Sequence, residues 1–145
     1  MASTKKYPQF TEQHDMLRKS LRDFVTRELA PHAEEWEEAR LFPREVFTEM
    51  GKLGYIGMRY PEEVGGSGGD IWHTTVLSEE LPRCRMAGLT MAMLVQSDMA
   101  TPIIDELGSD EVKREFLEPA VKGDKIAALG ISEPGGGSDV AAMRT

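Results

Sequence analysis

The sequence predicts an all-α fold, a helical bundle over residues 1–124, followed at residues 125–145 by the start of a β-type domain. Three observations predict it. Apolar residues recur at helical spacing through most of the chain. Prolines and glycines divide these stretches into separate helices. Finally, a turn signal at Gly123-Asp124 precedes a short apolar run that suits a strand.

The first helix is predicted to begin after Thr11, a residue type that caps helix N-termini. Its apolar positions fall on one face: Leu17, Leu21, Phe24, Val25 and Leu29. Pro31 ends this helix or begins the next. Residues 32–40 are acidic and helical around Trp36. We expect a solvated face with Trp36 turned inward, the alternative being an acidic docking surface.

The second group of helices is set by proline and glycine. Pro43 suits a first helical position, and that helix stops at Gly51 to Gly54. A long turn with four glycines follows at residues 60–70. The helix after it contains Ile71, Leu77 and Leu81 and ends at Pro82.

Residues 86–107 are apolar on nearly all sides, which predicts a helix buried in the middle of the bundle. Pro102 must kink this helix or restart it after Thr101. Ser109 is placed to cap a further helix. Residues 125–132 are then predicted to form the first strand of a truncated domain. A single strand with unpaired edges is not stable alone, so we expect residues after about 124 to be poorly ordered or paired with a neighbour.

Composition excludes several classes of function. Hydrophobic residues at 40% and charged residues at 29% are typical of a soluble globular protein. The formal net charge of -8 argues against nucleic acid as a partner. No apolar run approaches a membrane span, and the start MASTKKYPQF has no apolar core of a secretory signal. We therefore expect a cytoplasmic protein, or one of the mitochondrial matrix if eukaryotic.

Single residue types add further limits. Cys84 is the only cysteine, so no intrachain disulfide or cysteine metal cluster is possible. The nine methionines are expected mostly in the core, although the same softness suits a pocket for a long apolar ligand. His14, His32 and His73 are widely separated, which favours capping or surface roles and no metal site.

Nucleotide-binding and hydrolase motifs are missing from the sequence. The glycines at 65–69 do not form a dinucleotide fingerprint, because no strand leads into them. There is no Walker A pattern. Ser138 and Asp139 are adjacent, with no histidine near them in sequence, so a Ser-His-Asp triad is not indicated.

The last motif, ISEPGGGSD at residues 131–139, is chemically more specific. A strand ending in Ile131-Ser132 offers backbone N–H groups and a hydroxyl together, which suits the pyrimidine side of a flavin. The glycines let backbone approach a bulky ligand. Ser138 adds a hydroxyl and an amide for a phosphate or an amide-bearing chain. The alternative is a flexible glycine linker.

GISEPGGGSDVAA resembles the first signature of the acyl-CoA dehydrogenase family. Three other stretches match that family in order: PEEVGGSGGD, LSEEL, and GSDEVKREFLEPAVKGDKIAALGISEP. The similarity runs from about Phe10 to the last residue. The resemblance implies an N-terminal helical domain, then a β-domain, with FAD bound between the β-domain and a C-terminal helical domain.

The resemblance also implies site residues. Leu129, Ile131 and Ser132 would contact the flavin ring, and Gly137 and Ser138 would complete the FAD contact. Ser138 would also touch the pantetheine arm of an acyl-CoA. The acyl chain would lie against the buried helix, which makes Met91, Leu94 and Thr90 candidates for its pocket, with plain core as the alternative for Leu94.

The implied reaction oxidises an acyl-CoA thioester to the trans-2-enoyl-CoA and passes electrons to an electron-transfer flavoprotein. The family's catalytic glutamate belongs to the C-terminal domain, so we expect no catalytic residue in this chain; Glu79, Glu80 and Glu133 do not match it. A homo-oligomer, dimer or tetramer, is expected. Alternatives are a non-catalytic helical interaction module and a related flavin oxidase or monooxygenase.

Two positions depart from the family pattern. Gly136 stands where relatives often have Ala or Ser. Asp98 interrupts an apolar stretch, and we expect it to cap the helix restart at Thr101-Pro102. Contact with a polar acyl group is the alternative role for Asp98.

Overall fold

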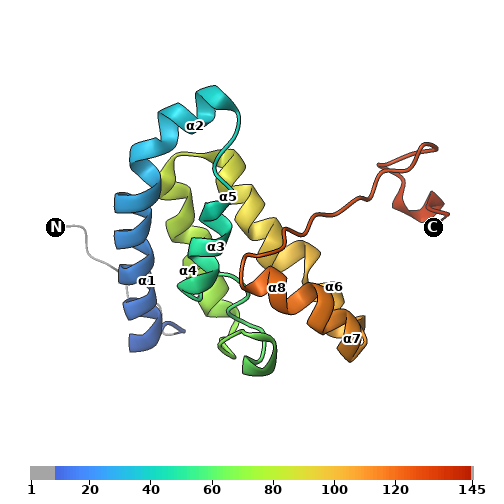
Figure 1. Ribbon diagram of the computed structural model, residues 1–145, viewed down its shortest axis with the longest axis horizontal. Coiled ribbons are helices and arrows are strands. Elements are labelled where there is room, and N and C mark those ends of the chain that lie inside the picture. The colour runs from blue at the N-terminus through green and yellow to red at the C-terminus, as the bar shows by residue number, and fades with distance from the viewer. Residues whose placement is uncertain (1–8, 145) are drawn as a thin grey trace.

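The computed structural model describes residues 9–144 as an all-helical body with an extended C-terminal arm (Figure 1). The α-helices are α1 (Glu12–Phe24), α2 (Ala33–Ala39), α3 (Glu45–Lys52), α4 (Ile71–Glu80), α5 (Ala87–Leu94), α6 (Pro102–Leu107), α7 (Asp110–Val112) and α8 (Glu118–Val121). Three π-helical segments continue them: η1 (Val25–Leu29), η5 (Val95–Ala100) and η6 (Lys113–Leu117). Short 3-10 turns are η2 (Ala30–His32), η3 (Glu62–Val64), η4 (Leu81–Cys84) and η7 (Val140–Ala142).

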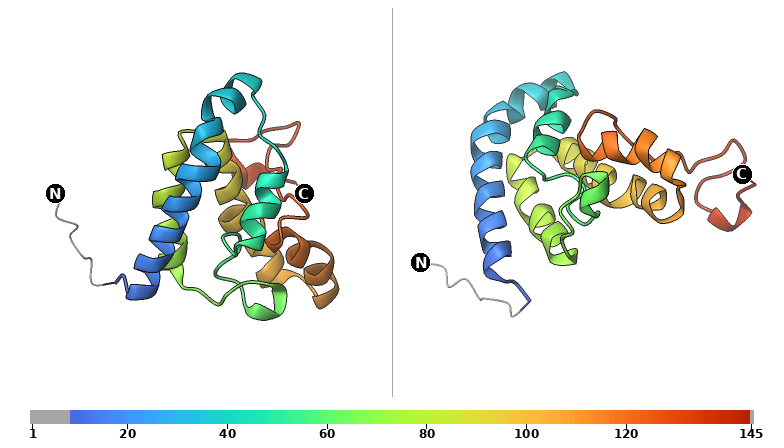
Figure 2. Two further views of the ribbon diagram at one scale, coloured as in Figure 1. Left: turned by 60° about the vertical axis from the view of Figure 1, so that its left-hand side comes forward. Right: turned by 60° about the horizontal axis from the view of Figure 1, so that its bottom comes forward.

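The helices form one packed group, which Figure 2 shows from two further sides. Helix α1 packs along α4, while η5, α6, η6 and α8 pack together at the opposite end. The prediction of an all-α bundle is confirmed. No helix within residues 9–144 is long and apolar enough to cross a membrane. Residues 1–8, part of the start that is predicted not to be a secretory signal, lie outside the described residues.

Capping residues set the helix starts, as the sequence predicts for Thr11 and Ser109. Thr11 is the N-cap of α1 and has extended backbone angles. Ser109 caps α7, where its Oγ accepts a hydrogen bond from the Val112 N–H at 3.3 Å. Asp70 caps α4 by accepting from the N–H groups of Trp72 and His73. The Ser109 and Asp70 caps each satisfy a backbone donor that the first helical turn leaves unpaired.

The core lies between α1, α3, α4 and α5. Leu21, Val25 and Leu29 are buried, and Leu17 and Phe24 pack partly buried beside them, so the predicted face of the first helix is confirmed. Trp36 is half-buried against the same core, and the acidic residues around it are exposed. Only half of the described methionines are core, contrary to the prediction for most of them: Met50, Met58, Met86 and Met93 are buried, and Met16, Met91, Met99 and Met143 are exposed.

The long turn after α3 is held against η5 by Tyr60. Its hydroxyl donates to the Ser97 carbonyl at 3.1 Å and lies 2.7 Å from the Thr101 hydroxyl. Burial raises the pKa of Tyr60 to about 12, so the hydroxyl stays protonated. Gly66 is required here, because a Cβ on it would lie 2.1 Å from the Tyr60 carbonyl oxygen.

The apolar stretch at 86–107 is not buried on all sides, and that prediction is wrong. Its predicted restart after Thr101 is confirmed, since α6 begins at Pro102. One side of the stretch is nevertheless exposed: Met91, Met99, Ile103 and Leu107. Sequence pattern shows that a side chain is apolar, and it does not show whether this chain itself supplies the surface that covers it.

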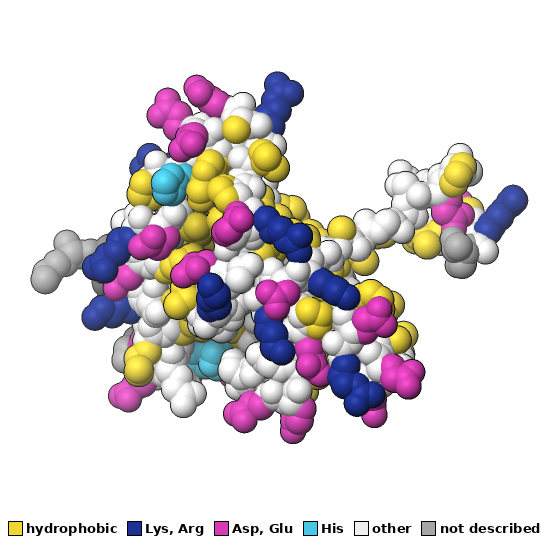
Figure 3. All heavy atoms as spheres, viewed as in Figure 1, with side chains coloured by type: hydrophobic (Ala, Val, Ile, Leu, Met, Phe, Trp, Pro, Cys, Tyr) yellow, Lys and Arg dark blue, Asp and Glu magenta, His cyan; other side chains and the backbone are white. Residues whose placement is uncertain are grey.

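Residues 125–132 do not form the predicted strand. The segment is extended, and the β-type pairing within residues 9–144 is limited to one isolated bridge between Glu133 and Gly136. A strand needs a neighbour for its backbone hydrogen bonds, and no described segment lies alongside this one. Figures 1 and 3 show that the chain leaves the helical body as an extended segment and folds back on itself near its end. We call residues 125–132 the arm and residues 133–144 the hook.

Candidate flavin-binding turn

The hook at the end of the arm is built around a closed turn at residues 133–136. The Glu133 N–H donates to the Gly136 carbonyl at 2.9 Å, and the Gly136 N–H donates to the Glu133 carbonyl at 3.1 Å. The Glu133 carboxylate accepts from the Arg144 N–H at 3.1 and 3.2 Å. These bonds fold the end of the chain back and leave an open hollow of about 490 Å³ inside the hook.

Glycine at position 137 brings Ser132 close to the following backbone. A Cβ at Gly137 would lie 2.9 Å from Ser132 Oγ, so a side chain there would displace the hydroxyl. A Cβ at Gly135 or Gly136 would meet nothing within 4 Å. An alanine at position 136 would therefore fit this turn, and glycine there is not required by space.

The five residues predicted to contact FAD lie together on the arm and hook and are accessible. Leu129 and Ile131 are exposed apolar side chains, and Ser132, Gly137 and Ser138 are exposed as well. Among the described residues, neither serine hydroxyl is used in a hydrogen bond. Apolar side chains and unused hydroxyl groups on one short segment can therefore meet a planar ligand with polar edges.

Gln96 fixes the point from which the arm leaves the body, a residue that the sequence analysis did not single out. It is fully buried in η5. Its Nε2 donates to the carbonyls of Ala120 and Lys125, each at 2.9 Å, and its Oε1 accepts from the Ala127 N–H at 2.7 Å. A lone glutamine within the apolar stretch 86–107 was the signal for such a role, because a buried amide needs partners.

A groove of about 610 Å³ lies where the arm leaves the body. It is lined mostly by apolar side chains from η5, α6, η6, α8 and the arm: Ala100, Ile104, Phe116, Ala120, Ile126, Ala127 and Ala128, with Arg44 and Lys125 at the edge. The Lys125 ammonium lies 4.6 Å from the centre of the Phe116 ring.

The predicted acyl-chain residues lie on the helical body, away from the turn (Figure 1). Met91 of α5 is exposed, whereas Leu94 is half-buried and packs against the core, in keeping with its alternative role. The Thr90 hydroxyl donates to the Met86 carbonyl at 2.8 Å. Within residues 9–144, the two sets of predicted residues are therefore not brought together.

Asp98 does not cap the helix restart, and that prediction is wrong. Its carboxyl hydrogen-bonds to Thr74 of α4 and faces the charge of Arg59, while its Oδ2 is buried without a hydrogen-bond partner among the described residues. Burial raises the pKa of Asp98 despite Arg59 and Thr74. The restart is held instead by the Thr101 hydroxyl, which donates to the Gln96 carbonyl at 2.5 Å.

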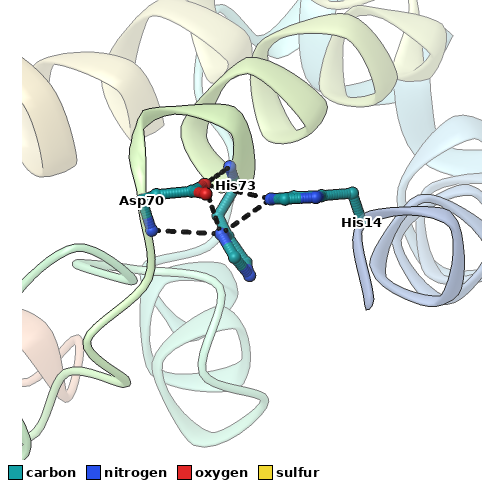
Figure 4. A group of neighbouring side chains, drawn as sticks. All are labelled: His14, Asp70 and His73. Carbon is teal, nitrogen blue, oxygen red and sulfur yellow. Dashed lines mark hydrogen bonds and ion pairs between the residues drawn. The ribbon is translucent and has the colours of Figure 1, made fainter. Parts of the chain in front are cut away.

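The expectation that the histidines lie apart is wrong for His14 and His73. Helix packing brings both rings to Asp70 (Figure 4), although each also caps a helix as expected. His14 Nδ1 accepts from the Thr11 N–H at 3.0 Å, and His73 Nδ1 accepts from the Asp70 N–H at 3.1 Å. The sequence signal was a repeated pattern, TEQH at 11–14 and DIWH at 70–73. His32 lies elsewhere, stacked on Trp36 at 4.8 Å.

Comparisons with known proteins agree with this fold. The family model of the acyl-CoA dehydrogenase N-terminal domain matches residues 11–124. A 3-(aryl)acrylate reductase of Clostridium sporogenes is 37% identical over 137 residues, which are 94% of this chain and 36% of the relative. The structure of an acyl-CoA dehydrogenase from Geobacillus kaustophilus has a TM-score of 0.87 and 32% identity, covering 94% of this chain and 35% of that one.

A further structure is that of an acyl-CoA dehydrogenase of Bacillus anthracis complexed with FAD, with a TM-score of 0.80 and 28% identity over 93% of this chain and 23% of that one. The chain thus spans about a third of the length of the relatives it matches, or less. The family match, the helical body and the ISEPGGGSD turn together show that the chain belongs to the acyl-CoA dehydrogenase family.

Proposed function

We propose that this chain supplies the N-terminal helical domain and the first flavin-contacting turn of an FAD-dependent acyl-CoA dehydrogenase. The reaction would oxidise an acyl-CoA thioester to the trans-2-enoyl-CoA. The observation that supports this most is the turn at residues 132–138, exposed on an arm that Gln96 anchors to the body. The resemblance of this turn to the family signature assigns it to the cofactor.

The residues present fit FAD in shape and chemistry. Leu129 and Ile131 offer apolar surface to the ring, and the free hydroxyl groups of Ser132 and Ser138 suit its polar edge and the adjoining chain. Gly137 allows close backbone approach. When bound, FAD accepts the hydride from the substrate; the part of this chain is to orient the ring and to stabilise the negative charge that reduction places on its pyrimidine side.

Proton removal is assigned to a residue outside these 145. The Glu133 carboxylate is engaged by the Arg144 N–H within the turn, and Glu80 is buried among arginines, so we assign the role to neither of them. Ser138 is proposed to touch the pantetheine arm, and Met91 and Leu94 to line the acyl-chain pocket. Electrons would pass to an electron-transfer flavoprotein, in the cytoplasm or the mitochondrial matrix.

The exposed apolar side of the stretch 86–107 suits contact with further domains or subunits of such an enzyme. Met91 is 57% exposed and Ile103 is 58% exposed, although large apolar side chains of this kind are usually buried against other apolar surface. We propose a homo-oligomer, a dimer or a tetramer, in the complete enzyme.

A second candidate is the same site working in the opposite direction. The Clostridium sporogenes relative is named a reductase of 3-(aryl)acrylates, which are α,β-unsaturated compounds. Reduction of such a double bond would use the same flavin contacts, so the fold of this domain is compatible with both directions.

The test is a chimera in which this chain replaces the matching segment of the Geobacillus kaustophilus enzyme. Acyl-CoAs of different chain length are added without oxygen, and bleaching of the flavin absorption is followed. The proposal expects bleaching by at least one saturated acyl-CoA. Reoxidation of the reduced flavin by enoyl or arylacrylate substrates alone would favour the reductase, rapid reoxidation by oxygen an oxidase. A chimera that holds FAD but reacts with none of these would support a non-catalytic module.

A further inference from the structure

Three potential metal ligands meet where α1 packs on the start of α4 (Figure 4). His14 Nε2 lies 3.0 Å from Asp70 Oδ1 and 3.1 Å from His73 Nδ1. His73 Nδ1 lies 2.8 Å from the same Asp70 Oδ1. The three atoms therefore form a closed triangle, one from α1 and two from the N-terminus of α4.

Protons alone satisfy this triangle poorly. The Asp70 N–H donates to His73 Nδ1, which requires a lone pair on that nitrogen. The lone pair then faces the Asp70 carboxylate oxygen at 2.8 Å, two acceptors in contact. If Nδ1 instead holds the proton, the bond from the Asp70 N–H is lost, and any proton on His14 Nε2 points at it across 3.1 Å. A cation bound by the three atoms turns the contact between His73 Nδ1 and Asp70 Oδ1 into shared coordination, and the single lone pair of Nδ1 then no longer accepts from the Asp70 N–H.

The surroundings favour the ligand form of His14. The ring is buried, and Phe10 packs on it edge-on at 5.9 Å between ring centres. Metal binding through Nε2 moves the ring proton to Nδ1, which exchanges the hydrogen bond accepted from the Thr11 N–H for one donated to the Thr11 hydroxyl oxygen, 2.9 Å away. Such a partner fixes the tautomer and orientation of a ligating histidine.

Asp70 and His73 provide charge and access. A carboxylate brings negative charge to the site, and Asp70 Oδ1 is held in place by the backbone N–H groups of Trp72 and His73, which donate to it at 2.9 and 3.2 Å. The Asp70 side chain is 54% exposed and that of His73 is 21% exposed, which leaves an entry path from solvent. Gly69 permits the close packing of backbone beside His73, because a Cβ there would lie 3.0 Å from the ring.

We propose that His14 Nε2, Asp70 Oδ1 and His73 Nδ1 bind a divalent first-row transition metal ion, with Zn²⁺ as its first probe. Two imidazole nitrogens and one carboxylate oxygen form a ligand set typical of Zn²⁺ and neighbouring ions, with water completing the coordination. Bonds of about 2.0–2.1 Å place tetrahedral ligands about 3.4 Å apart. The triangle reaches this by opening a few tenths of an ångström, which its two more exposed members can accommodate.

The ion joins two helices that are far apart in sequence. His14 lies in the first turn of α1, and the other ligands lie 56 and 59 positions later at the start of α4. Because the three ligands meet only when these helices are packed, the ion binds the folded chain and stabilises it.

The experiment is titration of the chain, purified without a histidine tag and freed of metal, with Zn²⁺ by calorimetry and with Co²⁺ by visible absorption. We expect one ion per chain, a d–d absorption band for Co²⁺, and a rise in Tm of about 5–10 °C at a hundredfold excess of Zn²⁺ over Kd. Asp70→Asn keeps a capping side chain but removes the anionic ligand, and His73→Gln removes one nitrogen. Each should weaken Zn²⁺ binding at least tenfold.

His32→Gln is the matched control, because His32 is the remaining histidine and stacks on Trp36 away from the site. It should leave affinity and stoichiometry unchanged. Absence of Zn²⁺ binding by the folded wild-type chain overturns the proposal. Binding that persists undiminished in both Asp70→Asn and His73→Gln, or that is lost in His32→Gln, overturns it as well.

Discussion

Replacing Glu80 with glutamine is expected to destabilise the helical body more than any single arginine replacement around it. Glu80 is fully buried at the end of α4 and accepts three hydrogen bonds, one from Arg18 at 2.9 Å and two from Arg22 at 2.7 and 2.8 Å. Arg83 adds an ion pair at 2.8 Å. The carboxylate thereby joins α1 to α4 and η4.

The loss of unfolding free energy depends on which charged side chain remains without its partner and how far that side chain is buried. Removing one partner of a buried ion pair costs about 3–5 kcal/mol when the other charge stays buried. Here the side chains of Arg18, Arg22 and Arg83 are 24%, 49% and 54% exposed, so water can hydrate them. We therefore expect a loss of about 2–3 kcal/mol for Glu80→Gln. Arg83→Gln leaves Glu80 with two arginines and should cost less than about 1 kcal/mol.

Urea unfolding at pH 7 measures both variants, with the m-value checking that the unfolding transition is unchanged. A pH series adds a second readout. Although burial raises it, hydrogen bonds from Arg22 and Arg18 hold the pKa of Glu80 below its usual range. Its contribution is complete above the unfolded-state value of about 4.3 and is lost as pH falls through the lower folded-state value. Glu80→Gln should lack this part of the acid destabilisation.

Equal losses of unfolding free energy in Glu80→Gln and Arg83→Gln would refute the reasoning. They would mean that the buried carboxylate contributes no more to stability than one exposed arginine beside it. An unchanged acid dependence in Glu80→Gln would refute it too, since other carboxylates would then account for the loss of stability.

Three further predictions concern single buried groups. Gln96→Leu should lower the unfolding free energy by about 1–3 kcal/mol and speed amide exchange of Ala127, because the arm loses its anchor; protection unchanged at Ala127 would contradict this. Asp98→Asn should raise the Tm by a few degrees at pH 7, since the ionised carboxyl is unfavourable when buried; the gain should shrink as pH falls through the raised folded-state pKa and vanish below the unfolded-state value of about 3.9. Gly123→Ala should cost clearly more than Gly54→Ala in thermal unfolding: both have positive φ, but only at Gly123 would a Cβ overlap a neighbouring carbonyl, whereas equal costs would show that φ alone decides.

Local signals predicted the helices well. Caps and breakers such as Thr11, Ser109 and Pro102 act within a few residues, so their effects can be read from sequence, and the structure confirms each of them. The resemblance to the acyl-CoA dehydrogenase family was also sound, because its motifs occur in order along the chain.

Long-range relations could not be predicted in the same way. The prediction of a strand at 125–132 was wrong because a strand depends on a partner segment, which the local sequence pattern does not reveal. Asp98 was assigned to its nearest helix start but bonds to Thr74, a neighbour only after packing. His14 and His73 meet for the same reason, 59 positions apart.

The most direct test of the flavin assignment compares the same substitution at two neighbouring glycines in the Geobacillus kaustophilus chimera. Gly137→Ala displaces the Ser132 hydroxyl, whereas Gly136→Ala meets nothing. FAD titration should show affinity reduced about 2–10-fold by Gly137→Ala, the equivalent of one hydrogen bond, and unchanged by Gly136→Ala. Equal FAD affinity in both variants and the unmodified chimera would contradict the assignment of this turn to the cofactor.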